Sequence, residues 1–415
     1  MSGGQPTSSV QRPFGTRFGR DQCGAVGPIF GVTAALLIVS VGVAIDYGRT
    51  LETRSVIQSA LDSAAVAASA ADVEDDSERS AVALQMFAAN YPASSAQPSV
   101  TVNGTTVTVM ARDTVPTALT SISGIESIEV SGSATATRVG GLPVCLLALN
   151  PTAPDAIYLT GSSRVDAPNC IVQANSAAAD ALHNQGSTMS TAAEFCAVGG
   201  FAGTNFSPQP TSGCRSVKDP YAGLPKPATA GCTYRNRQLL GGTFTASPGI
   251  YCGGLLVRNA TVTFLPGVYV IKDGQLRINS QSTVIGQGVT FYFYGTGPQG
   301  TTLDISSQTV VDWSAPTSGL FAGLVFVQHP AASPGFENNI IGGADTRIVG
   351  AGYFPTQVLK IGGSGNFGAR SAMMMFVADK IQLNGSAQLV LQADAAAAGM
   401  PDTMPRAYGG VRLSQ

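Results

Sequence analysis

The sequence predicts an α+β membrane-proximal module on a long N-terminal helix, followed by an all-β domain for which a parallel β-helix is favoured. Three observations predict this: one uncharged apolar stretch near the N-terminus, a helix–helix–hairpin pattern after it, and a Gly-rich polar repeat beyond. The 415 residues include 12% charged residues and carry a formal net charge of −2. Nucleic-acid binding needs a basic surface, so we do not expect this protein to bind nucleic acid.

The first predicted element is a transmembrane helix over residues 25–45, preceded by a cytoplasmic N-terminus over residues 1–24. No charged residue lies between Cys23 and Ile45. As a helix, the 21 residues 25–45 reach about 30 Å, which matches the hydrocarbon core of a bilayer. The positive-inside rule places the N-terminus in the cytoplasm and the bulk of the chain in the bacterial periplasm, because this flank carries Arg12, Arg17 and Arg20.

Two processed forms remain as alternatives to an uncleaved anchor. Gly42-Val43-Ala44 has the small-x-small pattern of a signal-peptidase site, although the apolar stretch is longer than the core of such peptides. A prepilin-type leader cut after Gly24 normally has Glu five residues later, where this chain has Ile29. The uncleaved, single-pass anchor is therefore favoured.

Residues 46–140 are predicted to form the small α+β module. The strongest local pattern is Asn103-Gly104 between two alternating apolar runs, which is typical of a β-hairpin. The full predicted order is a helix continuing over residues 46–71, a second helix capped by Asp76 or Ser77 and ending at Pro92, the hairpin, a short helix over residues 117–123, and a strand over residues 128–136.

One face of the first helix carries small residues at helical spacing. Such a stripe allows close approach of another backbone, so it is either the packing face of the module or an assembly face for a partner or a second copy. The residues of this candidate assembly stripe are Ala60, Leu61, Ala64, Ala67, Ala68 and Ala71.

The N-terminal third resembles the TadE/TadG-like family of Flp (tight-adherence) pilus-assembly proteins, in its TadG-type form. The resemblance rests on the run from Arg20 to Pro28, on Ala44-Ile45-Asp46-Tyr47-Gly48-Arg49, on Gln58–Ala65 and on the segment Val115–Thr137. It covers roughly residues 18–140 and implies an envelope protein anchored in the inner membrane, with other Flp/Tad proteins and the lipid bilayer as partners. The family assigns no catalytic residues.

The distal domain is predicted over residues 141–415, with an irregular insert over residues 199–236. Its repeat is an apolar-x-apolar triplet followed by small polar residues. Spacings of 25, 27 and 22 residues (157 to 182, 276 to 303, 359 to 381) are typical of solenoids. A β-sandwich and an irregular β-rich domain are the alternatives. The clearest triplets are Ile157–Leu159, Leu276–Ile278, Leu303–Ile305, Leu359–Ile361 and Ile381–Leu383.

Six of the seven cysteines lie in the exported part, and an even number there predicts disulfides in an oxidising compartment. The candidate cysteines are Cys145, Cys170, Cys196, Cys214, Cys232 and Cys252. The gaps of 25 and 26 residues from Cys145 to Cys170 to Cys196 suggest that these three share one column of the solenoid. Buried free thiols are the alternative, and a zinc site is disfavoured because no CxxC pair exists.

The remaining candidate chemistry is weak, so no catalytic, cofactor or metal site is predicted. Gly363-x-Gly365-x-x-Gly368 matches a dinucleotide fingerprint, but a strand rather than a helix is expected after it. His183 and His329 are expected in polar corners. Trp313 is expected in core or corner packing, and an exposed aromatic ledge formed with Phe321 and Phe326 is the alternative. The local charges, expected to be out of register and solvated, are Asp304, Asp312, Asp345, Arg347 and Lys360.

The sequence thus favours a non-enzymatic, inner-membrane-anchored component of the Flp/Tad pilus assembly or secretion machinery that acts through protein–protein contacts. The alternatives are a membrane-tethered β-helix that binds or cleaves polysaccharide, for which two carboxylates at glycosidase spacing remain conceivable, and a surface adhesin.

Overall fold

The computed structural model describes residues 26–414 except 72, 74, 93, 94, 139, 188, 296, 298, 299, 307, 343–345, 408 and 409. The expected cytoplasmic N-terminus, residues 1–24, and Asp345 lie outside the described residues. The chain divides into two compact units: unit 1 comprises Met1–Val139 with Gly410–Gln415, and unit 2 comprises Gly140–Gly409.

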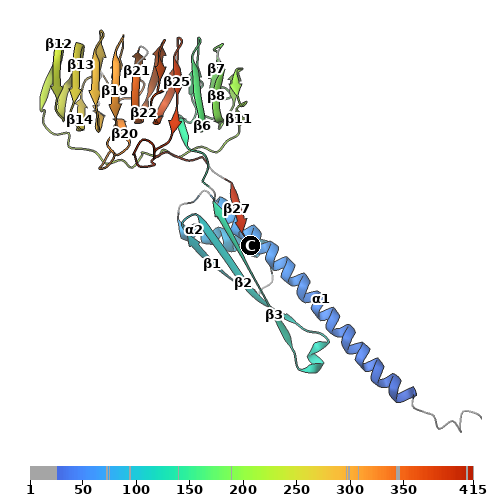
Figure 1. Ribbon diagram of the computed structural model, residues 1–415. Coiled ribbons are helices and arrows are strands. Elements are labelled where there is room, and N and C mark those ends of the chain that lie inside the picture. Colours follow the sequence, from blue (N-terminus) through green and yellow to red (C-terminus); the bar gives the residue numbers. More distant parts are fainter. Residues whose placement is uncertain are drawn as a thin grey trace, which may run out of the picture. The chain divides into compact units, whose positions relative to one another are not determined.

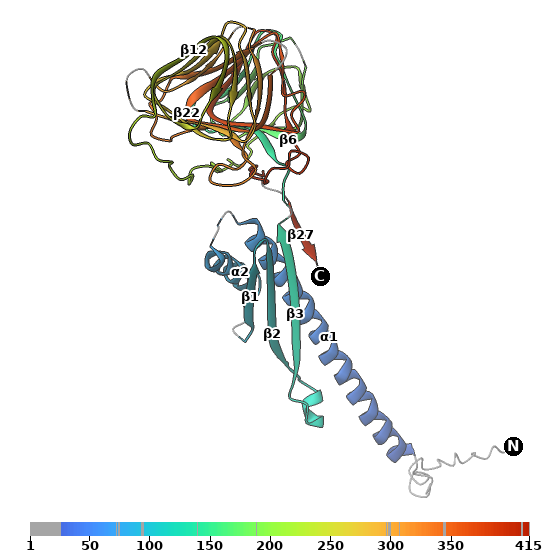
Figure 2. The ribbon, with the colours of Figure 1, turned by 60° about the vertical axis from the view of Figure 1, so that its left-hand side comes forward.

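Unit 1 is a pair of helices on one face of a four-stranded antiparallel sheet (Figures 1 and 2). The strand order is β1-β2-β3-β27. Up to β3, the order of elements agrees with the order that the sequence predicts. The elements are α1 (Val26–Ala70), α2 (Asp76–Asn90), β1 (Gln97–Asn103), β2 (Thr106–Pro116), the 3-10 helix η1 (Thr120–Ser123), β3 (Ser127–Arg138) and β27 (Val411–Ser414).

The core of unit 1 forms between the second half of α1 and the inner face of the sheet. Val107, Val109 and Ala111 of β2 are buried, whereas Met110 between the last two is exposed. The difference arises because side chains alternate between the two faces of a strand. The small residues of α1 let β3 approach closely. A Cβ on Gly132 would lie 2.9 Å from the Leu61 side chain.

The candidate assembly stripe is part of this core. Ala60, Leu61, Ala64 and Ala68 are at most 1% exposed, and they belong to the buried cluster shared with α2 and the sheet. The structure therefore shows the packing alternative for the stripe, and these four side chains are not available to a partner. Small residues were needed there because a sheet and a second helix crowd the same face of α1.

The ends of the helices are capped by groups that the sequence only partly indicates. The Asp75 side chain accepts a hydrogen bond from the Ser77 backbone N–H at 2.6 Å, so the cap of α2 lies one residue before the expected position. At the end of α1, the Arg138 guanidinium donates to the backbone carbonyls of Ser69 and Ala71. A cation at the C-terminus of a helix also favours the helix dipole.

Strand β27 places the last residues in unit 1 rather than in the distal domain. Val411–Ser414 pair antiparallel with Thr135–Arg138 of β3. The predicted distal domain, residues 141–415, is therefore too long at its C-terminal end, because Val411–Ser414 complete the sheet of unit 1. Unit 2 is therefore inserted between two neighbouring strands of unit 1, and two covalent connections join the units.

Unit 2 is mostly β, with a closed and largely parallel sheet (Figure 2). The first group of strands is β4 (Val144–Ala148), β5 (Ile157–Leu159), β6 (Arg164–Ala174), β7 (Leu182–Asn184), β8 (Ser190–Ala197), β9 (Phe201–Gly203), β10 (Phe206–Ser207) and β11 (Thr211–Ser212). The second group begins with β12 (Tyr234–Ala246), β13 (Gly249–Phe264), β14 (Gly267–Lys272), β15 (Leu276–Asn279), β16 (Thr283–Gly286), β17 (Val289–Tyr294), β18 (Leu303–Ile305) and β19 (Val310–Ser314). It continues with β20 (Leu324–Gln328), β21 (Glu337–Gly342), β22 (Thr346–Gly363), β23 (Asn366–Phe367), β24 (Met373–Leu383), β25 (Gln388–Val390) and β26 (Gln392–Ala393).

Strands of unit 2 pair with strands about three places later in the chain, as β14 does with β17, β15 with β18, and β16 with β19. These pairings are parallel and mostly in uniform register. The triplets that the sequence repeat identified lie in register: Leu276 is beside Leu303, and Leu359 is beside Ile381. The strands thus form a stack with β12 and β11 at opposite ends (Figure 1).

The chain enters this stack in its middle. β24, near the end of unit 2, pairs with β4 and β5, which begin it. From there the first group extends to β11 at one end. Residues 213–233 then carry the chain to β12, and the second group extends back to β24. We call residues 213–233 the crossing segment. It is shorter than the predicted insert of residues 199–236, because β9–β11 and the start of β12 belong to the stack.

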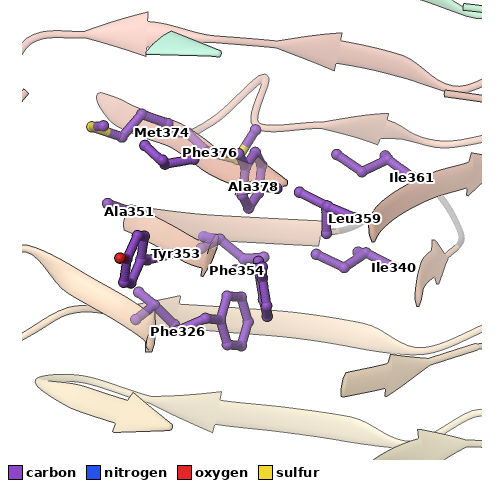
Figure 3. Close-up of a cluster of buried hydrophobic side chains, with 14 of the residues drawn as sticks. Phe326, Ile340, Ala351, Tyr353, Phe354, Leu359, Ile361, Met374, Phe376 and Ala378 are labelled. Atoms are coloured by element: carbon purple, nitrogen blue, oxygen red, sulfur yellow. The ribbon is translucent and has the colours of Figure 1, made fainter. Parts of the chain in front are cut away.

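Columns of inward-facing apolar residues fill the interior of unit 2. One column includes Phe291 and Phe326, in register with each other, and Trp313 packs against both rings. Figure 3 shows part of this core, with Phe326, Phe354 and Phe376 on the neighbouring strands β20, β22 and β24. Because each coil contributes to the same columns, one continuous apolar core runs along the stack.

Strand β12, at one end of the stack, has a charged residue, Arg237, where the neighbouring strands have an inward apolar residue. The register partner of Arg237 is Leu255, which in turn lies beside Leu276, and both leucines are buried. Arg237 is exposed and occupies the position that an apolar residue fills in these neighbouring coils. A charge at such a position of an edge strand opposes pairing with another chain, so it protects the open end of the stack.

Candidate functional site

The first half of α1 is an exposed apolar helix. Ile29, Phe30, Leu36 and Leu37 have 62–72% of their surface exposed, and only 6% of the most apolar window of the helix is buried. By length and composition this helix is able to cross a membrane. Tyr47, 60% exposed, follows the apolar stretch, where an aromatic ring suits the membrane–water boundary.

Asp46 lies where the apolar stretch ends and holds the loop between β2 and β3 against α1. Its carboxylate accepts backbone hydrogen bonds from Ala118 and Leu119 at 3.0 Å and from Thr120 at 2.9 Å, and one from the Thr120 hydroxyl at 2.7 Å. The residue is 3% exposed. These donors, those of Thr120 first, hold the pKa of Asp46 well below its usual value.

The interaction is equivalent to an N-terminal cap supplied by another helix. The Asp46 carboxylate accepts the N–H of Thr120, the first residue of η1, and the N–H groups of the two residues before it, which have no partner within η1. The loop is thereby fixed to the point of α1 where the apolar stretch meets the packed half.

A polar groove of about 860 Å³ lies between α1 and the sheet of unit 1. Gln58 crosses it and donates to Asp62 at 2.8 Å and to the Ser133 carbonyl at 3.0 Å. Arg54 and Arg112 also line it. The groove is an exposed surface of unit 1, in contrast to the buried alanine stripe.

In unit 2, one outward column carries polar side chains in register along the stack. Arg277 lies beside Asp304 and Asp304 beside Asn339; Asn339 is followed by Lys360 and Gln382. Tyr158 and His183 continue the column into the first group of strands. We call this set, Arg277, Asp304, Asn339, Lys360, Gln382, Tyr158 and His183, the polar column.

The expectation that the local charges are out of register is therefore wrong for four of them. Asp304 and Lys360 share the polar column. Asp312 and Arg347 are also direct register partners, with Arg347 Nη1 2.7 Å from Asp312 Oδ1. The sequence hides this order because the connections between strands differ in length, so equal register does not produce equal spacing.

Most charges of the polar column have an opposite charge nearby. Arg277 Nε lies 3.2 Å from Asp304, and Lys360 Nζ lies 2.6 Å from Glu337. His183 Nδ1 is 2.7 Å from Asp155, and its ring packs on Tyr158 with centroids 5.2 Å apart. Paired charges with neutral amides and one aromatic ring present a hydrogen-bonding surface of little net charge.

Three disulfides pair the six cysteines of unit 2, so the predicted disulfides are confirmed. Cys145–Cys170, Cys196–Cys214 and Cys232–Cys252 have Cα atoms 5.7, 5.9 and 5.6 Å apart, as disulfide geometry requires. The suggested shared column of Cys145, Cys170 and Cys196 is wrong. Cys145 and Cys170 lie at register shifts between β4, β6 and β8, while Cys196 is in register with Gln173.

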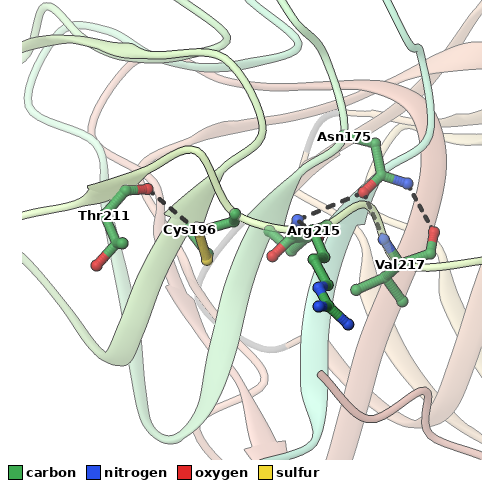
Figure 4. Close-up of a disulfide and its surroundings, with 7 residues drawn as sticks. Asn175, Cys196, Thr211, Arg215 and Val217 are labelled. Atoms are coloured by element: carbon green, nitrogen blue, oxygen red, sulfur yellow. Dashed lines mark hydrogen bonds between the residues drawn. A yellow bond between two sulfur atoms is a disulfide. The ribbon is translucent and has the colours of Figure 1, made fainter. Parts of the chain in front are cut away.

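Two of these disulfides fix the ends of the crossing segment. Cys214, the second residue of the segment, is bonded to Cys196 of β8. Cys232, the residue before its last, is bonded to Cys252 of β13. Figure 4 shows the first end with Cys196, and further along the segment the Asn175 amide donates to the Val217 carbonyl at 2.7 Å. The segment therefore cannot leave the stack at either end while both bonds exist.

Between its ends, the crossing segment covers outward side chains of the face formed by β14, β17, β20, β22, β24, β4 and β6. The Tyr353 hydroxyl donates to Asp219 at 2.7 Å, and the Tyr221 ring packs on Tyr353 with centroids 5.3 Å apart. Lys226 lies 4.0 Å from the centroid of the Tyr294 ring. Burial raises the pKa of Tyr292 on this face to about 12.

Among the described residues, Glu194, Cys196 and Cys214 bring one carboxylate oxygen and two sulfurs within 4.8 Å of one another. Because these two sulfurs form a disulfide, they are not thiolates and do not suit a metal ion.

The Gly-rich motif, Trp313 and His329 all have contacts that fit a structural role. Gly363-x-Gly365-x-x-Gly368 lies between β22 and β24, and strand β24 follows it, as expected. Trp313 is fully buried among aromatic rings, which is the core packing that was expected. His329 accepts a hydrogen bond from the Ala331 backbone N–H, and burial and nearby Lys226 lower its pKa.

Residues 24–72 match the model of the TadE/G-like Flp pilus-assembly family. They are a TadE/G-like segment. Comparison of the chain with curated proteins and with solved structures gives no match. The recognition that the sequence motifs suggested is therefore confirmed for this segment.

The TadE/G-like segment coincides almost completely with α1, including its exposed apolar half, Asp46 and the packed half. Asp46 belongs to the motif on which the resemblance rests, and its role here is to hold η1. An N-terminal helix that could span a membrane, within a TadE/G-like segment, fits a membrane-anchored pilus component.

Proposed function

We propose that this protein is a non-enzymatic, inner-membrane-anchored component of the Flp/Tad pilus assembly or secretion machinery that acts through protein–protein contacts. The observation that carries the proposal is the coincidence of the TadE/G-like segment with a helix whose first half is apolar and exposed and whose second half packs in unit 1. Such a helix joins an anchor to a folded body without a flexible linker.

The proposed topology is a cytoplasmic N-terminus with both units in the periplasm. Three arginines precede the apolar stretch, which favours the cytoplasm for that flank. Three disulfides in unit 2 favour an oxidising compartment for the rest. A thiol-reactive reagent that cannot cross membranes tests this: in intact spheroplasts it should modify Ser99→Cys of β1 and leave Cys23 unmodified.

We further propose that unit 2 is a parallel β-helix serving as a spacer or contact surface. The support is the parallel pairing of each strand with one about three places later and the continuous inward columns. The groove beside Gln58, rather than the alanine stripe, is the proposed contact surface of unit 1. It is also exposed in a monomer, so it is available to a Flp/Tad partner or to a second copy.

The direct test is deletion of the gene and complementation with variants. We expect deletion to abolish pilus assembly and surface adherence, and the full chain to restore both. Site-specific crosslinking from Ser59, on the exposed edge of the groove, should capture another Flp/Tad protein, whereas crosslinking from Ser99 on β1 serves as the matched control. Unchanged pili and adherence after deletion would contradict the proposal.

A second candidate function is polysaccharide binding by unit 2, and the polar column favours it. Its paired charges, amides and Tyr158 ring face outward in register, and such groups hydrogen-bond and stack on sugars. A glycan array with the full chain, together with a reducing-sugar assay, tests binding and cleavage. Binding that is lost in Tyr158→Ala and Gln382→Ala would support this function; silence in both assays would reject it.

A further inference from the structure

The loop between β2 and β3 carries apolar side chains that unit 1 does not cover. Leu119 is 39% exposed and Ile125 is 52% exposed. The sequence between Asp113 and Glu126 has no charged residue. An uncharged loop with exposed aliphatic side chains is unusual for a surface in water, where connections are normally polar.

This loop lies beside α1 at the end of the predicted transmembrane stretch. Asp46, which holds it, is the first residue after residues 25–45. Gly42 is one helical turn earlier on the same face, and a Cβ there would lie 2.7 Å from the Leu119 Cβ. The absence of a side chain at Gly42 therefore allows Leu119 to contact the helix within the apolar stretch.

The helical rise sets the depth of this contact. Gly42 precedes Ile45 by three residues, which places it about 4.5 Å inside the end of the stretch. Asp46 and Gly42 are the only residues from 41 to 47 that are buried, and the loop covers both. The exposed apolar surface of α1 thus continues without a break onto the exposed apolar surface of the loop.

We propose that the loop of residues 117–126 enters the interfacial layer of the bilayer, so that unit 1 contacts the membrane at a second point beside its transmembrane helix. The occupant of this surface is lipid, because the surface is continuous with the apolar face of the anchor helix and carries no charge from residue 117 to residue 125, with Glu126 at its end. A helix alone leaves rotation about its axis free; a second contact at one side of the helix fixes which side of unit 1 faces the membrane. This inference rests on the proposed membrane anchoring.

The experiment places an environment-sensitive fluorophore at single introduced cysteines of the full chain, in a Cys23→Ser background, reconstituted in phospholipid vesicles. The three sites are Ile125→Cys in the loop, Leu36→Cys in the apolar half of α1, and Ser99→Cys on β1 as the matched exposed control. We expect the labels at 36 and 125 to emit at shorter wavelength and to lose access to an aqueous quencher severalfold relative to the label at 99. Leu119→Cys provides a second loop site in case Ile125→Cys fails to fold.

The outcomes separate this inference from the anchoring on which it rests. A label at 36 in lipid, with labels at 119 and 125 as accessible to the quencher as the label at 99, would overturn loop insertion and leave the anchor intact. A label at 36 that is accessible from water would overturn the anchor itself. Quencher protection at 99 equal to that at 125 would show that the fluorophore itself inserts, and would also reject the proposal.

Discussion

Each unit has one segment that lies against its folded body, and the two segments are held in different ways. In unit 1, the loop of residues 117–126 is held on α1 by hydrogen bonds to the single carboxylate of Asp46. In unit 2, the crossing segment is held by a disulfide at each end and by tyrosine contacts between them. The first attachment depends on the charge of one group and the second on covalent bonds. Acid should therefore act on unit 1, and reducing agents on unit 2.

The largest effect is expected from removing both disulfides of the crossing segment, by Cys196→Ser with Cys214→Ser and Cys232→Ser with Cys252→Ser. Loops of 18 and 20 residues predict a loss of about 3 kcal/mol in the free energy of unfolding for each bond. Urea unfolding measures it. Limited proteolysis should then cleave between residues 215 and 231.

The matched control is Cys145→Ser with Cys170→Ser, which removes a bond between neighbouring coils. It should also lower the free energy of unfolding, but it should leave the crossing segment resistant to protease. Equal protection of the crossing segment in all variants would mean that the disulfides do not hold it.

A smaller effect is expected at the tyrosines beneath the crossing segment. Tyr353 is 1% exposed and donates to Asp219, so Tyr353→Ala should cost about 3–5 kcal/mol by loss of packing. Tyr353→Phe should cost about 1 kcal/mol by loss of one hydrogen bond. Tyr158→Ala on the open polar column is the control and should cost less than about 0.5 kcal/mol. Similar losses at 158 and 353 would contradict the claim that one face is covered and the other open.

In unit 1, Asp46→Asn should release the loop locally while α1 stays packed. Hydrogen exchange at the amides of residues 118–120 should become faster by roughly tenfold or more, with little change in the amides of β2 and β3. The isosteric amide keeps the shape and removes the charge, and Asp62→Asn in the groove serves as its control. Unchanged exchange at 118–120 would show that the carboxylate charge is not what holds η1.

The same site gives a pH prediction with a definite sign. The pKa of Asp46 lies below its ordinary value of 3.8, because the ionised form accepts the hydrogen bonds of Thr120, Ala118 and Leu119. Its stabilisation is therefore fully present above that ordinary value and is lost as pH falls through the lower, folded value. Exchange at residues 118–120 should accelerate in this acidic range in the wild type, and the acceleration should be absent in Asp46→Asn.

The smallest predicted effect is alkaline and concerns unit 2. Burial raises the pKa of Tyr292 from 10.0 to about 12. A raised folded pKa means that stabilisation is complete below about pH 10 and declines as pH rises toward about 12. Tyr292→Phe should flatten this decline in urea unfolding. If the free energy of unfolding falls equally steeply with pH in the variant, groups other than Tyr292 cause the decline.

The sequence predicts the elements of unit 1 and the repeating triplets of unit 2 because both depend on local spacing. Asn103-Gly104 forms its turn, Leu276 and Leu303 each begin a strand of the stack, and Leu359 lies within β22. The repeat does not predict the strand segment at residues 338–340, because a buried Asn338 replaces the first apolar residue of the triplet. Its side chain is satisfied by Gln357 and by the Leu303 backbone N–H.

Features that depend on residues far apart in the chain are not predictable from spacing. The spacing of the alanine stripe is compatible with both a core and an interface, although it favours a core, and the sheet opposite Ala64 decides between them. Asp46 was recognised in a motif, but its role depends on backbone donors more than 70 residues later. The polar column depends on connections of unequal length, which conceal the register of Asp304 and Lys360.

The entry of the chain into the middle of the stack has a kinetic consequence. Leu146 of β4 pairs with Phe376 of β24, so this junction closes only when strands about 230 residues apart (376 − 146) meet. Contacts of such long sequence separation form slowly, because the loop entropy is lost before the contact stabilises the chain. The two ends of the stack can each form from contiguous sequence, whereas its middle is completed last. We therefore expect partly folded molecules to expose the edges of β24 and β4, and a stalled chain to associate with others at that junction first.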